Sequence, residues 1–432
     1  MKVKRGIVWF TTDLRVSDNI TLLKAIEECE EIIPFYCLNE DLVKTTAFGF
    51  KKCGEHRLSF ILDSLQDLKI SLSRLGSDLL ISYGNPVQVL VETIKKYGVQ
   101  KVYVKKEVAW EEKTLQSKAE IELWKNKCLL EIYSSSTLYQ ATDFPFSIKD
   151  MPKLFTEFRQ KVEKESVIRT ETPYPKEIKT PKISETANLE SLRMKFPKPY
   201  SNDKSAFPFS GGESEAWNRI ESYFFKEKNL LQYKETRNGL IGTSYSSKLS
   251  PWLAQGCISP KSVYYNVKKL ENEVGANDST YWLIFELLWR DFFRFSMKKY
   301  GALYFLKGGI QNKNMDTYQN DPEKIDRWVQ GKTGVDFVDA NMKELSQTGF
   351  LSNRGRQIVA SYFCNDLKLD WRYGAAYFEA QLIDYDPCSN WGNWAYIAGV
   401  GNDPRAGRKF NTEKQEEQYD KDKRYQKVWN KI

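Results

Sequence analysis

Histidine is almost absent from this 432-residue sequence, in which His56 is the only one. Metal sites built from several histidines, and mechanisms that need two of them, are therefore excluded. The seven cysteines include no CxxC pair, and their odd number argues against a disulfide framework. Only three of them lie beyond residue 200, too few for a four-cysteine iron–sulfur cluster there. We therefore expect no metal site and a reducing, cytoplasmic environment.

Long hydrophobic runs are lacking as well. No stretch approaches the roughly 18 uncharged apolar residues that a membrane-spanning helix needs, and the most apolar segment contains Glu286, Arg290 and Asp291. The first ten residues pass from two lysines into a strand-like segment without a cleavage site of small residues, so we expect no signal peptide. The sequence predicts a monomer that does not enter a membrane.

Core-forming and aromatic residues are abundant. Hydrophobic residues make up 41% and charged residues 28% of the chain, which fits two or three globular domains. The 65 basic and 57 acidic residues give a net charge of +8, which permits a nucleic-acid partner without requiring one. Nine of the 12 tryptophans follow residue 200, where they indicate either a large helical core or an aromatic site for a cofactor or a base.

The first 135 residues alternate strand and helix patterns. Five short apolar runs are typical of buried strands, and the segments between them have the spacing of amphipathic helices. Five strands joined by crossover helices predict a doubly wound parallel sheet, although no GxGxxG follows the first strand. The expected strands span residues 6–10, 32–38, 79–83, 102–104 and 129–133, and the expected helices span residues 19–30, 56–75, 86–97 and 111–125.

The composition changes after this α/β region. Residues 145–208 hold 8 of the 15 prolines and predict a long connector with one short helix at 155–165. We expect an α/β domain over 1–135, a linker over 136–210 and an all-α domain over 211–432. The expected helices of the last domain span residues 213–227, 260–273, 280–299, 322–330, 335–348, 354–366 and 373–382.

Four segments of the second half could carry chemistry, and the first is residues 245–251, Tyr-Ser-Ser-Lys-Leu-Ser-Pro. Ser250 suits a helix N-cap and Pro251 the first helical position. Hydroxyls and free N–H groups at a helix N-terminus bind anions such as a pyrophosphate. The alternative is an ordinary turn capped by serine.

The second segment places Glu286, Trp289 and Arg290 on one face of a predicted helix. That helix is apolar nearly all round, which implies burial. Buried Glu and Arg side chains need partners and often mark a site. The alternative is a surface Glu–Arg pair.

The last two segments are residues 353–357 and 384–394. In the former, Asn-Arg-Gly-Arg-Gln, arginine forks suit carboxylates and phosphates, or else lie solvated at a helix N-terminus. In the latter, Asp384 and Asp386 could bind a metal, ribose hydroxyls or an arginine, or they could cap a turn.

These segments, in this order and at this spacing, resemble the cryptochrome/photolyase flavoprotein family, and specifically its DASH branch, over essentially the whole chain. The resemblance implies an α/β domain, a long linker and a helical domain that holds FAD in a U shape. It is carried by residues 9–19 (WFTTDLRVSDN), 155–163 (FTEFRQKVE), 233–260 (YKETRNGLIGTSYSSKLSPWLAQGCISP), 286–295 (ELLWRDFFRF), 341–361 (NMKELSQTGFLSNRGRQIVAS) and 384–405 (DYDPCSNWGNWAYIAGVGNDPR).

The resemblance also implies which residues contact cofactors. Arg356 would neutralise a buried carboxylate of Asp384, and Asn390, near the flavin N5, would tune which redox state is stable. Glu107 matches an acidic position near a methenyltetrahydrofolate antenna; the alternative is a surface glutamate. The other implied flavin, phosphate or ribityl contacts are Tyr233, Ser246, Ser247, Leu249, Ser250, Arg290 and Asp386.

The partner that the resemblance implies is DNA that contains a pyrimidine dimer. The dimer must leave a duplex to reach the flavin, at a cost of roughly a few kcal/mol, so single strands are preferred. Trp289 and Tyr396 could stack on it, and Glu286 could hydrogen-bond its bases; many duplex-active relatives have tryptophan at the position of Tyr396. Arg237 matches a lesion-phosphate contact, and the remaining residues facing the dimer would be Asn353, Arg354 and Gln357.

The leading hypothesis is therefore a light-driven repair enzyme. In the family, reduced FAD absorbs blue or near-UV light and donates one electron to a cyclobutane pyrimidine dimer, whose ring splits before the electron returns. The rival is a blue-light photoreceptor with a signalling role. A generic flavin-dependent oxidoreductase is a weaker alternative, because the sequence contains no nicotinamide motif.

The resemblance finally implies an electron route that recharges the flavin. Trp394 and Trp371 match the inner two of three aromatic donors, and the outer position falls on Tyr318. Tyrosine is harder to oxidise unless it loses its proton, so hole transfer to the surface would be slower, or would depend on a nearby base such as Asp316 or on an alternative donor. Trp391 is that alternative donor, unless it merely packs.

Overall fold

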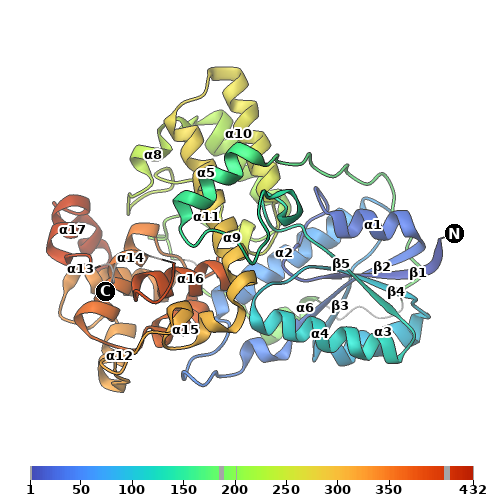
Figure 1. The fold of residues 1–432 in the computed structure, drawn as a ribbon, viewed down its shortest axis with the longest axis horizontal. Coiled ribbons are helices and arrows are strands. Elements are labelled where there is room, and N and C mark those ends of the chain that lie inside the picture. Colours follow the sequence, from blue (N-terminus) through green and yellow to red (C-terminus); the bar gives the residue numbers. More distant parts are fainter. Residues whose placement is uncertain (1, 184–188, 201, 403–408, 432) are drawn as a thin grey trace.

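The computed structural model describes residues 2–183, 189–200, 202–402 and 409–431. An α/β unit and a helical unit lie side by side and are joined by a long connection (Figure 1). The end of one segment that carries the family resemblance, residues 403–405, lies outside the described residues.

A five-stranded parallel sheet forms the α/β unit, as the sequence predicts. Its strand order is β3-β2-β1-β4-β5. The central strand β1 pairs Ile7 with Ile33 of β2 on one side and with Val102 of β4 on the other. The strands are β1 (Val3–Phe10), β2 (Cys29–Asn39), β3 (Leu80–Gly84), β4 (Lys101–Lys105) and β5 (Leu129–Tyr133).

The sheet lies between two layers of helices (Figure 1), and successive residues of β1 pack on opposite layers. Ile7 and Trp9 belong to the core shared with α3 and α4, whereas Val8 and Phe10 belong to the core shared with α1 and α2. Burial of both faces explains why these strands are continuous apolar runs in the sequence. The four helices are α1 (Ile20–Glu28), α2 (Glu55–Ser73), α3 (Pro86–Tyr97) and α4 (Trp110–Lys125).

The helical unit contains the helices that the sequence predicts, two of which end as π-helices. The helix expected over 213–227 begins as α7 (Glu213–Ile220) and continues as a π-helix (Glu221–Lys226). The helix expected over 354–366 likewise comprises α14 (Asn353–Ser361) and a π-helix (Tyr362–Asp366). The other predicted ones are α10 (Pro260–Val274), α11 (Asp278–Tyr300), α12 (Pro322–Val329), α13 (Asp336–Thr348) and α15 (Trp371–Gln381).

Helix α16 (Pro387–Ile397) was not expected from the sequence. Glycine and asparagine are weak helix formers, which hides the helical pattern there. Tertiary packing selects the helix: a Cβ added at Gly392 would lie 2.4 Å from Cδ1 of Phe293 in α11, so only glycine permits this approach. The structure also has short helices that the sequence analysis did not predict, α6 (Leu189–Lys195), α8 (Tyr233–Thr236), α17 (Thr412–Tyr419) and α18 (Arg424–Asn430). A further short helix, α9 (Ser250–Ala254), lies where the sequence predicts a helix start at Ser250 and Pro251.

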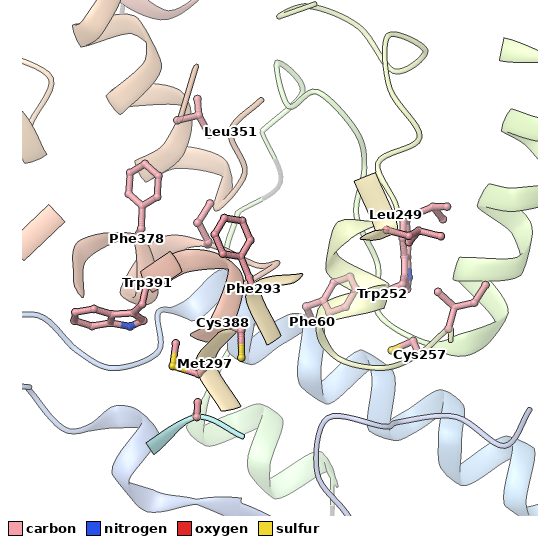
Figure 2. Close-up of a cluster of buried hydrophobic side chains, with 14 of the residues drawn as sticks. Phe60, Leu249, Trp252, Cys257, Phe293, Met297, Leu351, Phe378, Cys388 and Trp391 are labelled. Carbon is pink, nitrogen blue, oxygen red and sulfur yellow. The ribbon is translucent and has the colours of Figure 1, made fainter. Parts of the chain in front are cut away.

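The two units share a buried interface. The Arg15 guanidinium donates a hydrogen bond to the carbonyl of Gly256 (2.8 Å). Gly256 has a φ of +67°, and a Cβ there would lie 2.1 Å from the carbonyl oxygen of Thr12, so this approach requires glycine. Figure 2 shows Phe60 of α2 beside Trp252 of α9, with ring centroids 6.0 Å apart. The interface therefore holds the α9 turn against the α/β unit.

The region expected to be a linker is partly packed. Helix α5 (Phe155–Glu165), which matches the predicted bounds, buries Phe158 and Val162. The domain boundaries at 135 and 210 stay predictions. None of the described helices is both long and apolar enough to cross a membrane, and the described residues bring no three potential metal ligands together.

Candidate functional site

A cavity of about 440 Å³ lies within the helical unit. It is enclosed by α8, α9, α11, α14, α16 and the turn before α9. Most residues that the family resemblance implies for flavin and lesion contacts come together on its walls. These are Tyr233, Arg237, Ser247, Leu249, Ser250, Glu286, Trp289, Arg290, Asn353, Arg356, Gln357, Asp384, Asp386 and Tyr396.

A smaller cavity of about 100 Å³ adjoins it and is lined by Asn390 and Trp394. Arg356, Asp384 and Asp386 line both cavities. The amide of Asn390 is held by a hydrogen bond from its Nδ2 to the carbonyl of Ala375 (3.0 Å). The two cavities therefore form one continuous candidate site.

Two of the residues predicted to contact the flavin or the lesion, Ser246 and Arg354, do not line these cavities. Ser246 contributes its backbone carbonyl to a hydrogen bond from Arg219 (3.0 Å). Arg354 packs its guanidinium over the ring of Tyr419, 4.6 Å from the centroid. His56 lies on α2 and lines neither cavity.

The serine-rich turn is held by a residue that the sequence analysis missed. Arg219 is 4% exposed and donates to the carbonyls of Ser247 (2.8 Å) and Thr243 (2.8 Å) as well as to that of Ser246. Backbone carbonyls leave no sequence signature, so no motif indicates this role. Arg219 therefore holds the turn through its backbone carbonyls.

The expected N-cap at Ser250 is wrong by one residue. Helix α9 begins at Ser250 itself, and the cap position is Leu249, whose side chain cannot cap. Leu249 already has helical dihedral angles, so the chain enters the helix one residue earlier than the serine suggests. The Ser250 hydroxyl is thus not needed for capping.

The predicted ion pair between Arg356 and Asp384 is present. Nη2 of Arg356 lies 2.8 Å from Oδ2 of Asp384, and its Nε donates to the carbonyl of Leu351 (2.8 Å). The Asp384 side chain is only 2% exposed. Its Oδ1 is buried and has no hydrogen-bond partner among the described residues, so the cavity offers an acceptor to a bound donor.

Positive charge surrounds the second carboxylate, Asp386. Burial would raise its pKa, but the charges of Arg290 and Arg294 reverse this effect and lower the pKa. Nη1 of Arg294 lies 3.4 Å from Oδ2 of Asp386. Asp386 also accepts a hydrogen bond from the backbone N–H of Ser389 (2.8 Å) and so caps α16.

Glu286 pairs with Arg237 and not with Arg290 four residues away. The Nη1–Oε1 distance to Arg237 is 2.5 Å, which excludes the simple surface pair along one helix. Burial raises the pKa of Glu286, although the charge of Arg237 acts in the opposite direction. Trp289 stacks on Phe155, with centroids 3.7 Å apart. An acid and an aromatic platform thus lie on the same cavity.

The first of the predicted electron donors, Trp394, lines the smaller cavity. Trp394 is 2% exposed, and its ring centroid lies 6.1 Å from that of Trp328. Trp371 is fully buried, 5.7 Å from Trp391 by ring centroids. Trp391 is 5% exposed, so it does not reach the surface, whereas Tyr318 is half-buried.

The role of Asp316 as a base stays a prediction. Within the described residues, the hydroxyl of Tyr318 forms no hydrogen bond to Asp316. Burial raises the pKa of Tyr318, which further opposes loss of its proton. If the electron route ends at Tyr318, we therefore expect it to be a poorer donor than tryptophan at this position.

A second large cavity, about 420 Å³, lies between the sheet and the helical unit. Glu107 lines it, but its carboxylate pairs with Lys105 (2.5 Å) and Arg294 (3.0 Å). The sequence analysis missed Glu112 on the same cavity, whose buried Oε2 has no partner among the described residues. Burial raises the pKa of Glu112 to about 7. Its place in the first turn of α4, shortly after Glu107 in the sequence, could have indicated it.

Two family models match the chain. One, described as the FAD binding domain of DNA photolyase, matches residues 282–431, and one described as DNA photolyase matches residues 6–178. The chain is 45% identical over 422 residues to "Cryptochrome DASH" of Xenopus laevis, covering 96% of this chain and 80% of that protein. It is 46% identical over 424 residues to "Cryptochrome DASH" of Danio rerio, covering 96% and 81%.

Solved structures agree with these matches. A cryptochrome from Synechocystis sp. superposes with a TM-score of 0.95 at 44% identity, covering 99% of this chain and 89% of that chain. A bacterial class III photolyase from Agrobacterium tumefaciens gives a TM-score of 0.82 at 27% identity, covering 99% and 87%. An archaeal photolyase from Sulfolobus tokodaii, solved with two FAD molecules, gives 0.79 at 26% identity, covering 98% and 90%.

Proposed function

The chain belongs to the DASH branch of the cryptochrome/photolyase flavoprotein family, and from this premise we propose that it repairs cyclobutane pyrimidine dimers under blue light, preferentially in single-stranded DNA. The observation that carries the proposal is the cavity in which the Glu286–Arg237 pair and Trp289 share walls with the Arg356–Asp384 pair. The lesion and the flavin would therefore lie in the same cavity.

The residues of this cavity fit FAD. The free Oδ1 of Asp384 can accept from a ring N–H, while its Oδ2 pairs with Arg356. The hydroxyls of Ser247 and Ser250 would hold phosphate oxygens, while Asn390 would contact the ring system. When bound, FAD supplies the electron that light excites.

The acid and the aromatic residues would receive the dimer. Trp289 is already held flat by Phe155, so it presents a rigid surface for a flipped base. Its ring and that of Tyr396 meet edge to face, at 82° and 6.2 Å. A carboxyl with a raised pKa, such as Glu286, can share a proton with a base that has gained an electron.

Preference for single strands follows from the cost of flipping. Unpairing and unstacking a dimer costs roughly a few kcal/mol in a duplex and least in a single strand. Tyr396 offers less stacking surface than the tryptophan of many duplex-active relatives, so less binding energy is available to offset that cost. The proposal includes a cytoplasmic monomer, in which the seven free cysteines stay reduced.

Replacement of Glu286 tests the repair role directly. We expect Glu286→Ala to lower the repair yield per absorbed photon by roughly tenfold or more. The dimer that has gained an electron would then have no carboxyl group to share a proton with it. The dissociation constant for a dimer-containing single strand should change by less than about threefold, because stacking on Trp289 remains. Repair is measured by product analysis after calibrated illumination, and binding is measured in the dark.

Glu286→Gln serves as the matched control, since it keeps the shape and a hydrogen-bond donor without an acid. It should recover part of the yield. An unchanged yield in Glu286→Ala would contradict the role proposed for this residue. A complete lack of repair in the wild type, with intact FAD, would favour the photoreceptor alternative suggested by the name of the relatives.

We also propose that the cavity between the units binds methenyltetrahydrofolate as an antenna. Glu112 supports this proposal more strongly than Glu107, because its buried Oε2 is free to accept from a pterin amino group. Folate-reconstituted protein should show a near-UV absorption band that Glu112→Ala removes. The same band in wild type and variant would exclude this contact.

A further inference from the structure

Arg294 lines the cavity between the units and contacts Asp386, which also lines the flavin cavity. It lies on α11, one turn after Arg290, and its side chain is 7% exposed. Its Nη2 donates to Oε2 of Glu107 in the segment between β4 and α4 (3.0 Å), and its Nη1 to Oδ2 of Asp386 before α16 (3.4 Å). Glu107 is in turn paired with Lys105 at the end of β4. A continuous chain of charges therefore runs from the sheet to the flavin cavity.

Asp386 stands at the junction of all these cavities. It lines the cavity between the units and both cavities of the flavin site. Its other carboxylate oxygen caps α16, the helix that carries Asn390 and Trp394. The orientation of this carboxylate thus sets both an acceptor in the flavin site and the start of the helix behind it.

We propose that Arg294 is a positioning residue that couples the cavity between the units to FAD binding: Glu107 holds the guanidinium, and the guanidinium holds Asp386. The proposal rests on the FAD site proposed above. A planar guanidinium can serve two carboxylates at once in a fixed geometry, which a lysine cannot. If one of the two carboxylates is removed, the Arg294 guanidinium can turn toward the remaining one. Removal of Glu107 would in this way shift the guanidinium, and with it Asp386.

The direction in which FAD affinity changes when the charge of Glu107 is removed distinguishes this positioning role from an electrostatic effect that acts only through space. FAD carries negative phosphates, so removal of the Glu107 charge acting only through space would tighten FAD binding. Removal of Glu107 as the holder of Arg294 would instead misplace Asp386 and weaken FAD binding. The two explanations therefore predict opposite changes in the dissociation constant.

The experiment measures FAD dissociation constants from flavin released by the diluted full-length holoprotein. We expect Glu107→Gln to weaken binding about fivefold and Arg294→Met about tenfold. The double variant should bind within twofold of Arg294→Met alone, because Glu107 acts through Arg294. Glu111→Gln is the matched control: it removes a charge from the exposed side of α4, where Glu111 pairs with Lys52, and should change binding less than twofold.

Tighter or unchanged binding in Glu107→Gln, or the same factor in both backgrounds, would overturn the coupling while leaving the FAD site intact. If Arg294→Met does not fold, the sign of the Glu107→Gln effect alone decides. Arg294→Lys gives a further readout, since it keeps the charge but not the fork. Recovery of wild-type affinity by lysine would show that charge, not positioning, matters. Absence of FAD from the wild type would contradict the proposed function itself.

Discussion

Arg356→Ala is expected to purify almost free of flavin. The substitution leaves the 2% exposed carboxylate of Asp384 without its cation, and breaking a buried pair in this way costs about 3–5 kcal/mol. That carboxylate can then take up a proton or turn away, and in either case it ceases to be a charged acceptor in the cavity. We expect FAD affinity to fall at least about thirtyfold. The flavin-to-protein absorbance ratio after purification measures the effect.

Asp384→Asn in the Arg356→Ala background tests the cause. If the stranded carboxylate is responsible, removal of its charge should restore part of the flavin content. Arg356→Lys should bind FAD more weakly than wild type but better than Arg356→Ala, because a lysine cannot also reach the carbonyl of Leu351 with the same geometry. Full flavin content in Arg356→Ala would refute the placement of FAD in this cavity.

The second large effect is expected on light-driven reduction of the bound flavin. Trp394 adjoins the smaller flavin cavity and packs tightly, since a Cβ at Gly374 would lie 2.2 Å from its ring. Trp394→Phe keeps most of this packing but replaces indole with a ring that is far harder to oxidise. Photoreduction should be nearly abolished while FAD content is retained. Absorbance of the flavin under steady illumination with an external reductant measures both quantities.

Tyr318→Trp is the complementary variant and should accelerate photoreduction, because indole can be oxidised without first losing a proton, whereas burial raises the pKa of Tyr318 and opposes loss of its proton. Tyr318→Phe should have only a modest effect. The route would instead end at Trp391 if Tyr318→Trp leaves the rate unchanged and Trp391→Phe lowers it. Burial of Trp391 at 5% exposure argues against that ending, since the hole must reach a reductant in solution.

The fold could largely be predicted from local patterns. Buried parallel strands are continuous apolar runs in the sequence. These runs, and the helical spacing of apolar residues in the segments between them, indicated the five-stranded sheet. Helix α16 escaped prediction because Gly392 and its asparagine neighbours disfavour helix locally, and the contact with Phe293 that compensates is 99 residues distant in sequence. Long-range packing of this kind has no local signature.

In the candidate site, too, some residues could be predicted from the sequence, whereas others are defined only by long-range contacts. The residues implied by the family resemblance meet in one cavity, and Arg356 finds Asp384 as expected. Arg219 and Arg294 were missed, because the former binds backbone carbonyls and the latter binds a carboxylate 187 positions away. Both act by holding other groups, which a motif does not reveal.

The central claim is light-dependent repair with a preference for single strands. The most direct measurement illuminates the purified, FAD-loaded protein with a dimer-containing oligonucleotide, once as a single strand and once in duplex, with dark controls. The account predicts repaired product in the light only, with a higher yield from the single strand at equal subsaturating concentration. No product from either substrate would contradict repair, and equal yields from both would contradict the preference for single strands.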